Sequence, residues 1–97
     1  MPFEWDESKN RSNLAKHKIS LETARFVFDD PYALSVQDRV VEGEERWQTL
    51  GTISAIVVIV AHTYRGEDGD ETIRLISARK ANATERHRYA ENRRRSE

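Results

Sequence analysis

An uninterrupted apolar run at residues 56–61, Ile-Val-Val-Ile-Val-Ala, places the strongest constraint on the fold of this chain. All of its residues except the last are β-branched, and such side chains favour extended strands. Successive side chains of a strand point to opposite faces of the sheet, so a run that is apolar at every position needs cover on both faces. We therefore expect residues 56–61 to form a central strand.

A second strand is predicted at residues 71–77, where Ile73 and Leu75 alternate with Arg74. Arg74 and Arg79 are five residues apart, so they would point to opposite faces of one continuous strand. We infer that the strand ends near Ser77 and that the chain turns before Arg79. Both guanidinium groups could then serve one site.

The rest of the chain alternates between helix and strand signals. Residues 3–5 suggest a short strand, Asp6 caps a polar helix that extends to about residue 17, and Ser20 caps a second helix that Asp29-Asp30-Pro31 ends. Strands follow near residues 34–37 and 46–50, separated by a charged turn at 38–44, and residues 66–70 form a loop. A capping box at residues 82–85 begins the last helix, which reaches about residue 94. The order β-α-α-β-β-β-β-α predicts an α+β fold with helices packed on an antiparallel sheet.

Length and composition exclude several classes of protein. Ninety-seven residues suit a single domain spanning residues 1–97, with a frayed basic end at 93–97. The absence of cysteine excludes disulfides and thiolate chemistry, and the three histidines lack metal-ligand spacing, so we expect no metal and no cofactor. The longest apolar run is far shorter than the roughly 20 residues that span a bilayer. We expect a cytoplasmic protein without membrane contact.

The net charge of -1 conceals an uneven distribution. Residues 73–97 hold 8 Lys and Arg against 3 Asp and Glu, a balance of +5, and residues 1–72 hold 8 against 14, a balance of -6. This uneven charge would suit a protein that binds a polyanion with one surface and a cationic partner with another. Charged residues that merely solvate helices are the simpler explanation.

The cations near residue 74 suggest chemistry on RNA. If the loop at 66–70 sets Arg65 opposite Glu71, an antiparallel register places His62 opposite Arg74, on one face. Metal-free RNA cleavage needs a positioned 2′-hydroxyl, cations for the charged transition state and a proton donor for the leaving oxygen. The candidate catalytic groups are the cations Arg65, Arg74, Arg79 and Lys80, with His62 or Tyr64 moving the proton.

Each candidate also has a structural explanation. His62 could be a hydrogen-bonded sheet residue, and Arg74 could form an ion pair with Glu71 or another acid. Glu85 could cap the last helix, and Trp47 could pack without stacking on a base. The first helix carries Lys9, Arg11, Asn13 and Lys16 on an expected exposed face, which either contacts phosphates or is simply solvated.

The ordered motifs resemble one known family, the BrnT toxins, over residues 3 to about 91. The motifs that carry the resemblance are Phe3-Glu4-Trp5-Asp6 with Lys9 and Asn13, Lys16-His17 before the Ser20 helix with Ala24, Phe28-Asp29-Asp30-Pro31, Gly43-Glu44-Glu45-Arg46, and Ile73-Arg74-Leu75-Ile76-Ser77-Ala78-Arg79-Lys80-Ala81 with Glu85-Arg86 and Tyr89. The last motif is the most specific. The chain departs from the family pattern at Lys18 and at the turn at residues 52–55, where glycine is usual.

The resemblance implies a toxin of a type II toxin–antitoxin module, a RelE-like, metal-independent endoribonuclease that inhibits growth. A BrnA-type antitoxin with a ribbon-helix-helix domain would neutralise it in a 2:2 complex, and operator DNA would be bound only through that antitoxin. The implied RNA contacts are Lys9, Lys16, His17, Tyr64, Arg86 and Tyr89. The antitoxin would cover the same basic surface of the sheet and last helix. The alternative is a module that binds RNA or protein without cutting, such as an inactive toxin relic.

Overall fold

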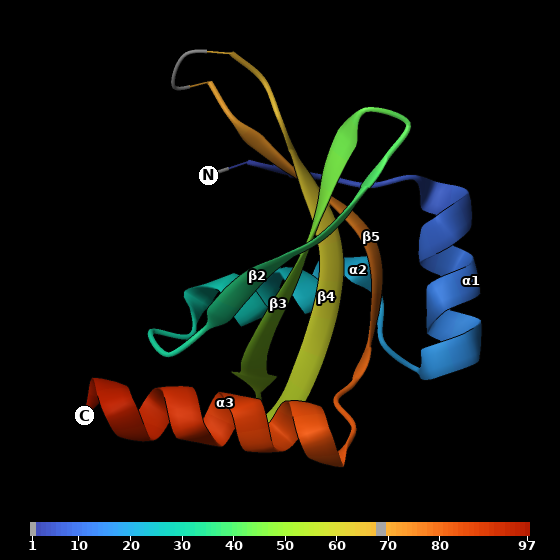
Figure 1. The fold of residues 1–97 in the computed structure, drawn as a ribbon. Coiled ribbons are helices and arrows are strands. Elements are labelled where there is room, and N and C mark those ends of the chain that lie inside the picture. Colours follow the sequence, from blue (N-terminus) through green and yellow to red (C-terminus); the bar gives the residue numbers. More distant parts are fainter. Residues whose placement is uncertain (1, 68–69) are drawn as a thin grey trace.

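The computed structural model describes residues 2–67 and 70–97, and within them five strands form one sheet in the order β1-β5-β4-β3-β2 (Figure 1). The strands are β1 (Phe3–Glu4), β2 (Leu34–Val41), β3 (Glu44–Ile53), β4 (Ile56–Arg65) and β5 (Thr72–Lys80). The helices are α1 (Glu7–His17), α2 (Leu21–Ala24), the 3-10 helix η1 (Arg25–Asp29) and α3 (Ala83–Ser96). This order confirms the predicted succession of elements and the α+β class. No helix in the described ranges has the length and apolar character needed to cross a bilayer.

The sheet is mixed, so the prediction of a purely antiparallel sheet was wrong. Strands β2 to β5 pair antiparallel, but β1 pairs parallel with β5, with Phe3 opposite Ile73 and Glu4 opposite Arg74. A strand of two residues carries no periodic pattern from which its direction could be read. Its place at the edge is set by pairing with a strand about 70 residues later in the chain.

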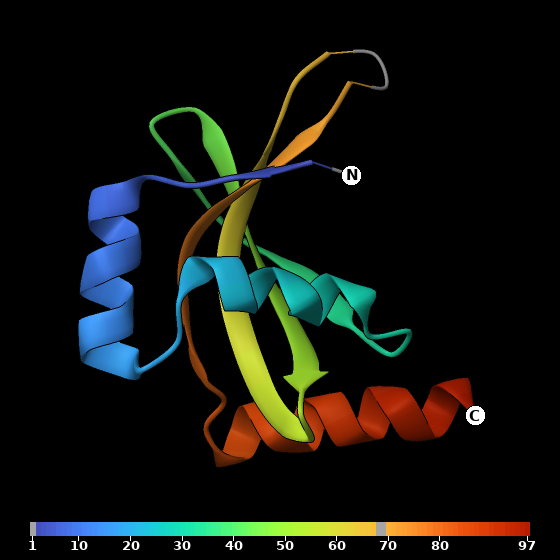
Figure 2. The same cartoon turned by 180° about the vertical axis from the view of Figure 1, so that it is seen from behind.

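Strand β4 lies at the centre of the sheet with cover on both faces, as its sequence required. On one face Val58 and Val60 pack in a core with Leu21, Ala24 and Val27 of α2 and η1. On the other face Ile59 packs with Leu50, Ala81 and Tyr89, so α3 covers one end of that face. Figure 2 shows α2 and η1 crossing one face of the sheet while α3 runs along its lower end.

Several predicted ends of helices and strands differ from those in the structure. The charged segment 38–44 is mostly strand, because β2 continues to Val41 and β3 begins at Glu44, and both sit in a hairpin arm whose side chains are largely solvated. Helix α3 continues to Ser96, so the basic end expected to fray is helical. The loop expected at 66–70 contains residues 68 and 69, which lie outside the described residues.

A β-bulge at Ile76 changes the alternation of β5. His62 pairs with Leu75 and Ala61 pairs with Ser77, which leaves Ile76 as an extra residue without a partner on β4. The extra residue shifts the side-chain alternation by one position. Leu75 and Ala78, three residues apart, therefore both lie in the core. Arg74 and Arg79 share the opposite face. Strand β5 continues to Lys80, so the predicted end of the strand near Ser77 was wrong, and that both guanidinium groups serve one site stays a prediction.

Helix α1 is held to β5 by the amide of Asn13. Its Nδ2 donates to the carbonyls of Ala78 and Ile19, at 2.8 Å each, and its Oδ1 accepts from the Ala78 N–H at 3.1 Å. Because β1 pairs with β5 only around Ile73 and Arg74, the side chain of Asn13 takes the place of a missing edge strand at Ala78. We had predicted Asn13 on the exposed face, but it is 6% exposed, whereas Leu14 is 50% exposed.

We predict that Asn13→Ala lowers the free energy of unfolding by about 2 kcal/mol, because it leaves the buried N–H and C=O of Ala78 without partners. Urea unfolding measures the change, and Ser12→Ala on the exposed side of α1 is the matched control. A loss of less than about 0.5 kcal/mol, the range of neutral surface changes, would show that water replaces the amide.

Two of the places where the family pattern has glycine have left-handed backbone. Lys18 at the end of α1 has φ 62°, and Ser54 and Ala55 in the β3–β4 turn have φ 49° and 68°. Two consecutive positive φ angles describe a type I′ hairpin turn, which favours Asn-Gly. The side chains of this chain therefore carry local strain that glycine would avoid.

We expect Ala55→Gly to raise the free energy of unfolding by about 1 kcal/mol, since the left-handed conformation costs roughly that much for a residue with a Cβ. Chemical denaturation is the measurement. Ala90→Gly in α3 is the control with the opposite expected sign, because glycine destabilises a helix interior. A destabilised Ala55→Gly protein would contradict this account of the turn.

Candidate functional site

Four arginines from neighbouring strands lie on the sheet face opposite α2, and we call this surface the arginine face. Its members are Arg46 of β3, Arg65 of β4, and Arg74 and Arg79 of β5. Their common orientation follows from the register, since Arg79 is opposite Ile59 and Arg74 is opposite Thr63, both on the side away from the α2 core. Three of the four predicted catalytic cations therefore meet on one surface. The fourth, Lys80, pairs with Val58 and points to the other face.

Each arginine of this face has a carboxylate neighbour. Arg74 lies 3.6 Å from Glu4, so the acid that pairs with it is Glu4 and not Glu71. Arg65 and Arg46 share Glu44, at 3.3 and 3.8 Å. These pairs are partly exposed to solvent, and exposed pairs contribute about 0–1 kcal/mol. A phosphate group can therefore displace these carboxylates at low cost.

Arg79 is held more firmly than the others. Its Nη1 and Nη2 donate to the two carboxylate oxygens of Glu85 at 2.8 and 2.9 Å. Glu85 also accepts from the Asn82 N–H in a capping box, which confirms its predicted role as a cap. The hydrogen bond from Arg79 lowers the pKa of Glu85, and the same bond raises the pKa of Arg79. The pair fixes the guanidinium between the end of β5 and the start of α3.

Two hollows border Arg79 and α1. The first, about 60 Å³, is lined by Gln48, Ile59, Ala61, Ser77 and Arg79. The second, about 210 Å³, lies between α1 and the bulge of β5 and is lined by Lys9, Ser12, Asn13, Lys16, His17, Ile76 and Ser77. Ser77 lines both hollows and so joins them. The predicted RNA contacts of α1, which are Lys9, Lys16 and His17, therefore border one strip of surface with Arg79, and we call it the basic strip.

His62 lies in the core, so the predicted register was wrong by one residue. It pairs with Leu75 and not with Arg74, and it is 0% exposed on the face opposite the arginines. Its Nε2 hydrogen-bonds Thr49 Oγ1 at 2.7 Å, and its ring packs edge-on against Phe28. Burial lowers the pKa of His62 to about 4. The sheet role considered for His62 fits this position, and its side chain has no path to an RNA on the arginine face.

The remaining predicted contacts are scattered. Tyr64 pairs with Ile73, so it too lies on the face opposite the arginines, where its ring packs against Trp47. Tyr89 of α3 is 4% exposed and donates to Asp30, so its side chain lies in the core between α3 and the sheet. Arg86 is exposed on α3 and donates to the Ala81 carbonyl. Of these three, Arg86 is exposed near the start of α3, whereas Tyr64 faces away from the arginines and Tyr89 is buried.

Sequence reasoning missed Arg46 and the hollow around Gln48 and Ser77. A signal existed, because Arg46, Gln48 and Leu50 alternate along one face of β3. Joining that face to Arg79 required the position of the bulge, which the sequence does not mark. In the described part of the chain, no group of three or more His, Asp or Glu residues is arranged to hold a metal ion.

We predict that His62 makes stability depend on pH. Its folded pKa of about 4 lies below the ordinary 6.5, so between these values the unfolded chain binds a proton that the folded chain excludes. The free energy of unfolding should therefore fall by up to about 3 kcal/mol as pH drops from 6.5 to 4. His62→Phe, measured by urea unfolding over the same range, should lack this component. Identical pH profiles for both proteins would contradict it.

Comparison with protein-family models gives a match over most of the chain. The sequence model of a family described as "Ribonuclease toxin, BrnT, of type II toxin-antitoxin system" matches residues 5–85. That range contains α1, β2 to β5 and the capping box of α3, and therefore all four members of the arginine face. No curated protein matches the chain.

Proposed function

The chain belongs to the BrnT family of ribonuclease toxins of type II toxin–antitoxin systems, and from this premise we propose that it cleaves RNA on the arginine face without a metal ion. The observation that carries the proposal is that the bulge at Ile76 puts Arg74 and Arg79 on the same face of the sheet. Arg65 and Arg46 extend the same surface. The carboxylate of Glu44 serves two of these guanidinium groups, so the face carries more cations than paired anions.

The arginines would act by stabilising charge. In the proposed reaction the 2′-oxygen of RNA attacks the adjacent phosphorus and the bond from phosphorus to the 5′-oxygen breaks, which leaves a 2′,3′-cyclic phosphate and a 5′-hydroxyl. The 2′-hydroxyl proton passes to water, and water supplies the proton to the 5′-oxygen. Arg79, held rigidly by Glu85, would bind the phosphate oxygens as their charge grows. Arg74 and Arg65 would exchange their surface carboxylates for phosphates.

The RNA would lie along the basic strip as a single strand. Lys9, Lys16 and His17 line the α1 side of that strip, and Arg86 lies beyond Arg79 on α3. Such contacts to phosphates give affinity without sequence readout. We leave Tyr64 and Tyr89 out of the proposed interface because one faces away from the arginines and the other is buried.

We further propose that the fold is RelE-like and that the toxin acts in the cytoplasm. Its type II family implies an antitoxin partner, which we expect to be a BrnA-type protein with a ribbon-helix-helix domain in a 2:2 complex. A dimeric antitoxin has one site for each toxin copy, which sets that stoichiometry. Operator DNA would be contacted only by the antitoxin.

A second candidate, a binding module that does not cut RNA, is favoured by one observation. Every member of the arginine face has a carboxylate neighbour, and neither predicted proton carrier, His62 or Tyr64, lies on that face. In that case the basic strip would bind RNA with similar affinity but leave it intact. The cleavage assay separates the two functions.

We predict that the purified protein cuts single-stranded RNA in excess EDTA and that Arg74→Ala and Arg79→Ala each lower the rate by about 10²–10³-fold, because each removes a preorganised charge donor. Arg79→Lys should lose most of the rate as well, since an ammonium cannot reproduce the two parallel bonds to Glu85.

Arg95→Ala, on the exposed end of α3, is the matched control and should leave the rate unchanged. Thermal unfolding establishes that each variant is folded. Cleavage that requires added magnesium would refute the mechanism, and RNA that is bound but never cut by the wild-type protein would establish the second candidate.

A further inference from the structure

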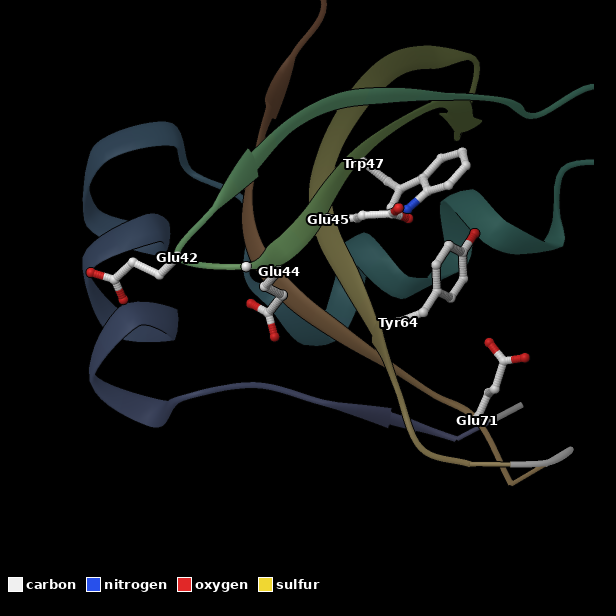
Figure 3. A pocket seen from close by; sticks show the side chains of 7 residues that line it. Glu42, Glu44, Glu45, Trp47, Tyr64 and Glu71 are labelled. Carbon is white, nitrogen blue, oxygen red and sulfur yellow. The ribbon is translucent and has the colours of Figure 1, made fainter.

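One hollow of the molecule is acidic, and one of its carboxylates, Glu44, also pairs with Arg46 and Arg65 of the arginine face. It measures about 530 Å³ and is lined by Glu42, Gly43, Glu44, Glu45, Trp47, Tyr64 and Glu71 (Figure 3). We call it the acidic pocket. Tyr64 pairs with Ile73 and Trp47 pairs with His62, and these partners lie on the α2 side of the sheet. The pocket therefore opens on the opposite face from Arg74 and Arg79.

The carboxylates of the acidic pocket are largely uncompensated. Glu44 is paired with Arg65 and Arg46, but within residues 2–67 and 70–97 Glu42, Glu45 and Glu71 form no ion pair. Burial raises the pKa of Tyr64, and the negative charge of Glu71 raises it further. Phosphate groups of RNA would be repelled here, and a cation would be attracted.

Two aromatic rings add a second type of contact. Trp47 and Tyr64 meet edge-to-face with centroids 5.6 Å apart, and Tyr64 is 37% exposed (Figure 3). Aromatic rings beside carboxylates bind an organic cation through both charge and the ring face. Arginine suits such a site better than lysine, because its planar guanidinium stacks on rings and binds carboxylates with two parallel bonds.

The aromatic wall is supported by rings packed behind it. The Tyr64 ring packs against His62 at 5.2 Å, and His62 packs against Phe28 at 5.0 Å, so the exposed ring is supported by a buried one. A wall fixed in advance loses little conformational entropy when a side chain docks. His62 thus acquires a role as a support for the pocket, in place of the catalytic role that its sequence position suggested.

We propose that the acidic pocket receives an arginine side chain from a segment of the antitoxin. This inference rests on the proposed function, because it takes the antitoxin as the partner, and on the charge complementarity between the three free carboxylates and a guanidinium. The antitoxin would then have an anchor on the face opposite Arg74 and Arg79, apart from the basic surface that the family resemblance leads us to expect it to cover. Loss of this anchor should weaken antitoxin binding and leave RNA cleavage by the free toxin unchanged.

The test uses the toxin with its co-expressed ribbon-helix-helix antitoxin, together with N-acetyl-arginine amide as a small probe. In Glu45→Gln/Glu71→Gln the affinity for the antitoxin should fall at least tenfold by calorimetry, with an unchanged RNA cleavage rate. The probe should shift the NMR signals of Trp47 and Tyr64 in the wild-type protein and not in the variant. Glu22→Gln/Glu67→Gln, two exposed carboxylates outside the pocket, is the matched control.

Antitoxin affinity that is unchanged in the pocket variant overturns the proposal, even if RNA cleavage by the toxin is established. A toxin without any cleavage activity refutes the proposed function but leaves antitoxin affinity and probe binding as readouts of the pocket. A second possible occupant is the basic end of α3 in another copy, at Arg93, Arg94 and Arg95. Concentration-dependent dimers that the pocket variant abolishes, with antitoxin affinity intact, would identify that occupant instead.

Discussion

The extra residue in β5 is the constraint on which the rest of this structure depends. Ile76 shifts the alternation of the strand, so Leu75 and Ala78 both enter the core while Arg74 and Arg79 both face the opposite side. The same irregularity lies next to Ala78, whose backbone groups bind the amide of Asn13. The core, the attachment of α1 and the composition of the arginine face therefore follow from one local departure from regular pairing.

The charged groups of the molecule fall into two classes with different energetics. The ion pairs of Arg65 and Arg74 are at the surface and weak, which suits groups that must exchange partners. Asp30 is different, because it accepts hydrogen bonds from Tyr89, from Tyr32 and from both the N–H and the hydroxyl of Thr52. Burial alone would raise its pKa, but these hydrogen bonds lower it. Asp30 thus fastens α3 to the sheet, and the arginines remain available for ligands.

The sequence supported the element order well because caps, turns and apolar periodicity are local signals. Prediction from the sequence failed where the result depended on which residues of neighbouring strands pair with each other. The bulge at Ile76 leaves no mark in composition, so the face of every residue beyond it was uncertain, and a register error of one residue moved His62 from the core to the candidate site. Asn13 was missed for another reason. Amphipathic patterns point to apolar residues such as Leu14 as the buried contacts of a helix, whereas α1 is attached to the sheet through the polar amide of Asn13.

The bulge also determines which parts of this chain can change in length during evolution. Loss of Ile76 would restore regular pairing and leave Ala78 in the core and Arg79 on the opposite face. Gain of a further residue between Leu75 and Ser77 would instead reverse every later side chain of β5, sending Arg79 into the core and Ala78 to the surface. The hairpin arms around Glu42 and Gly66 lie outside the core. A change in their length therefore does not move core residues to the surface. Among relatives, insertions and deletions should therefore collect in the two hairpin arms, while the two arginines of β5 stay five residues apart, or four where the bulge is absent.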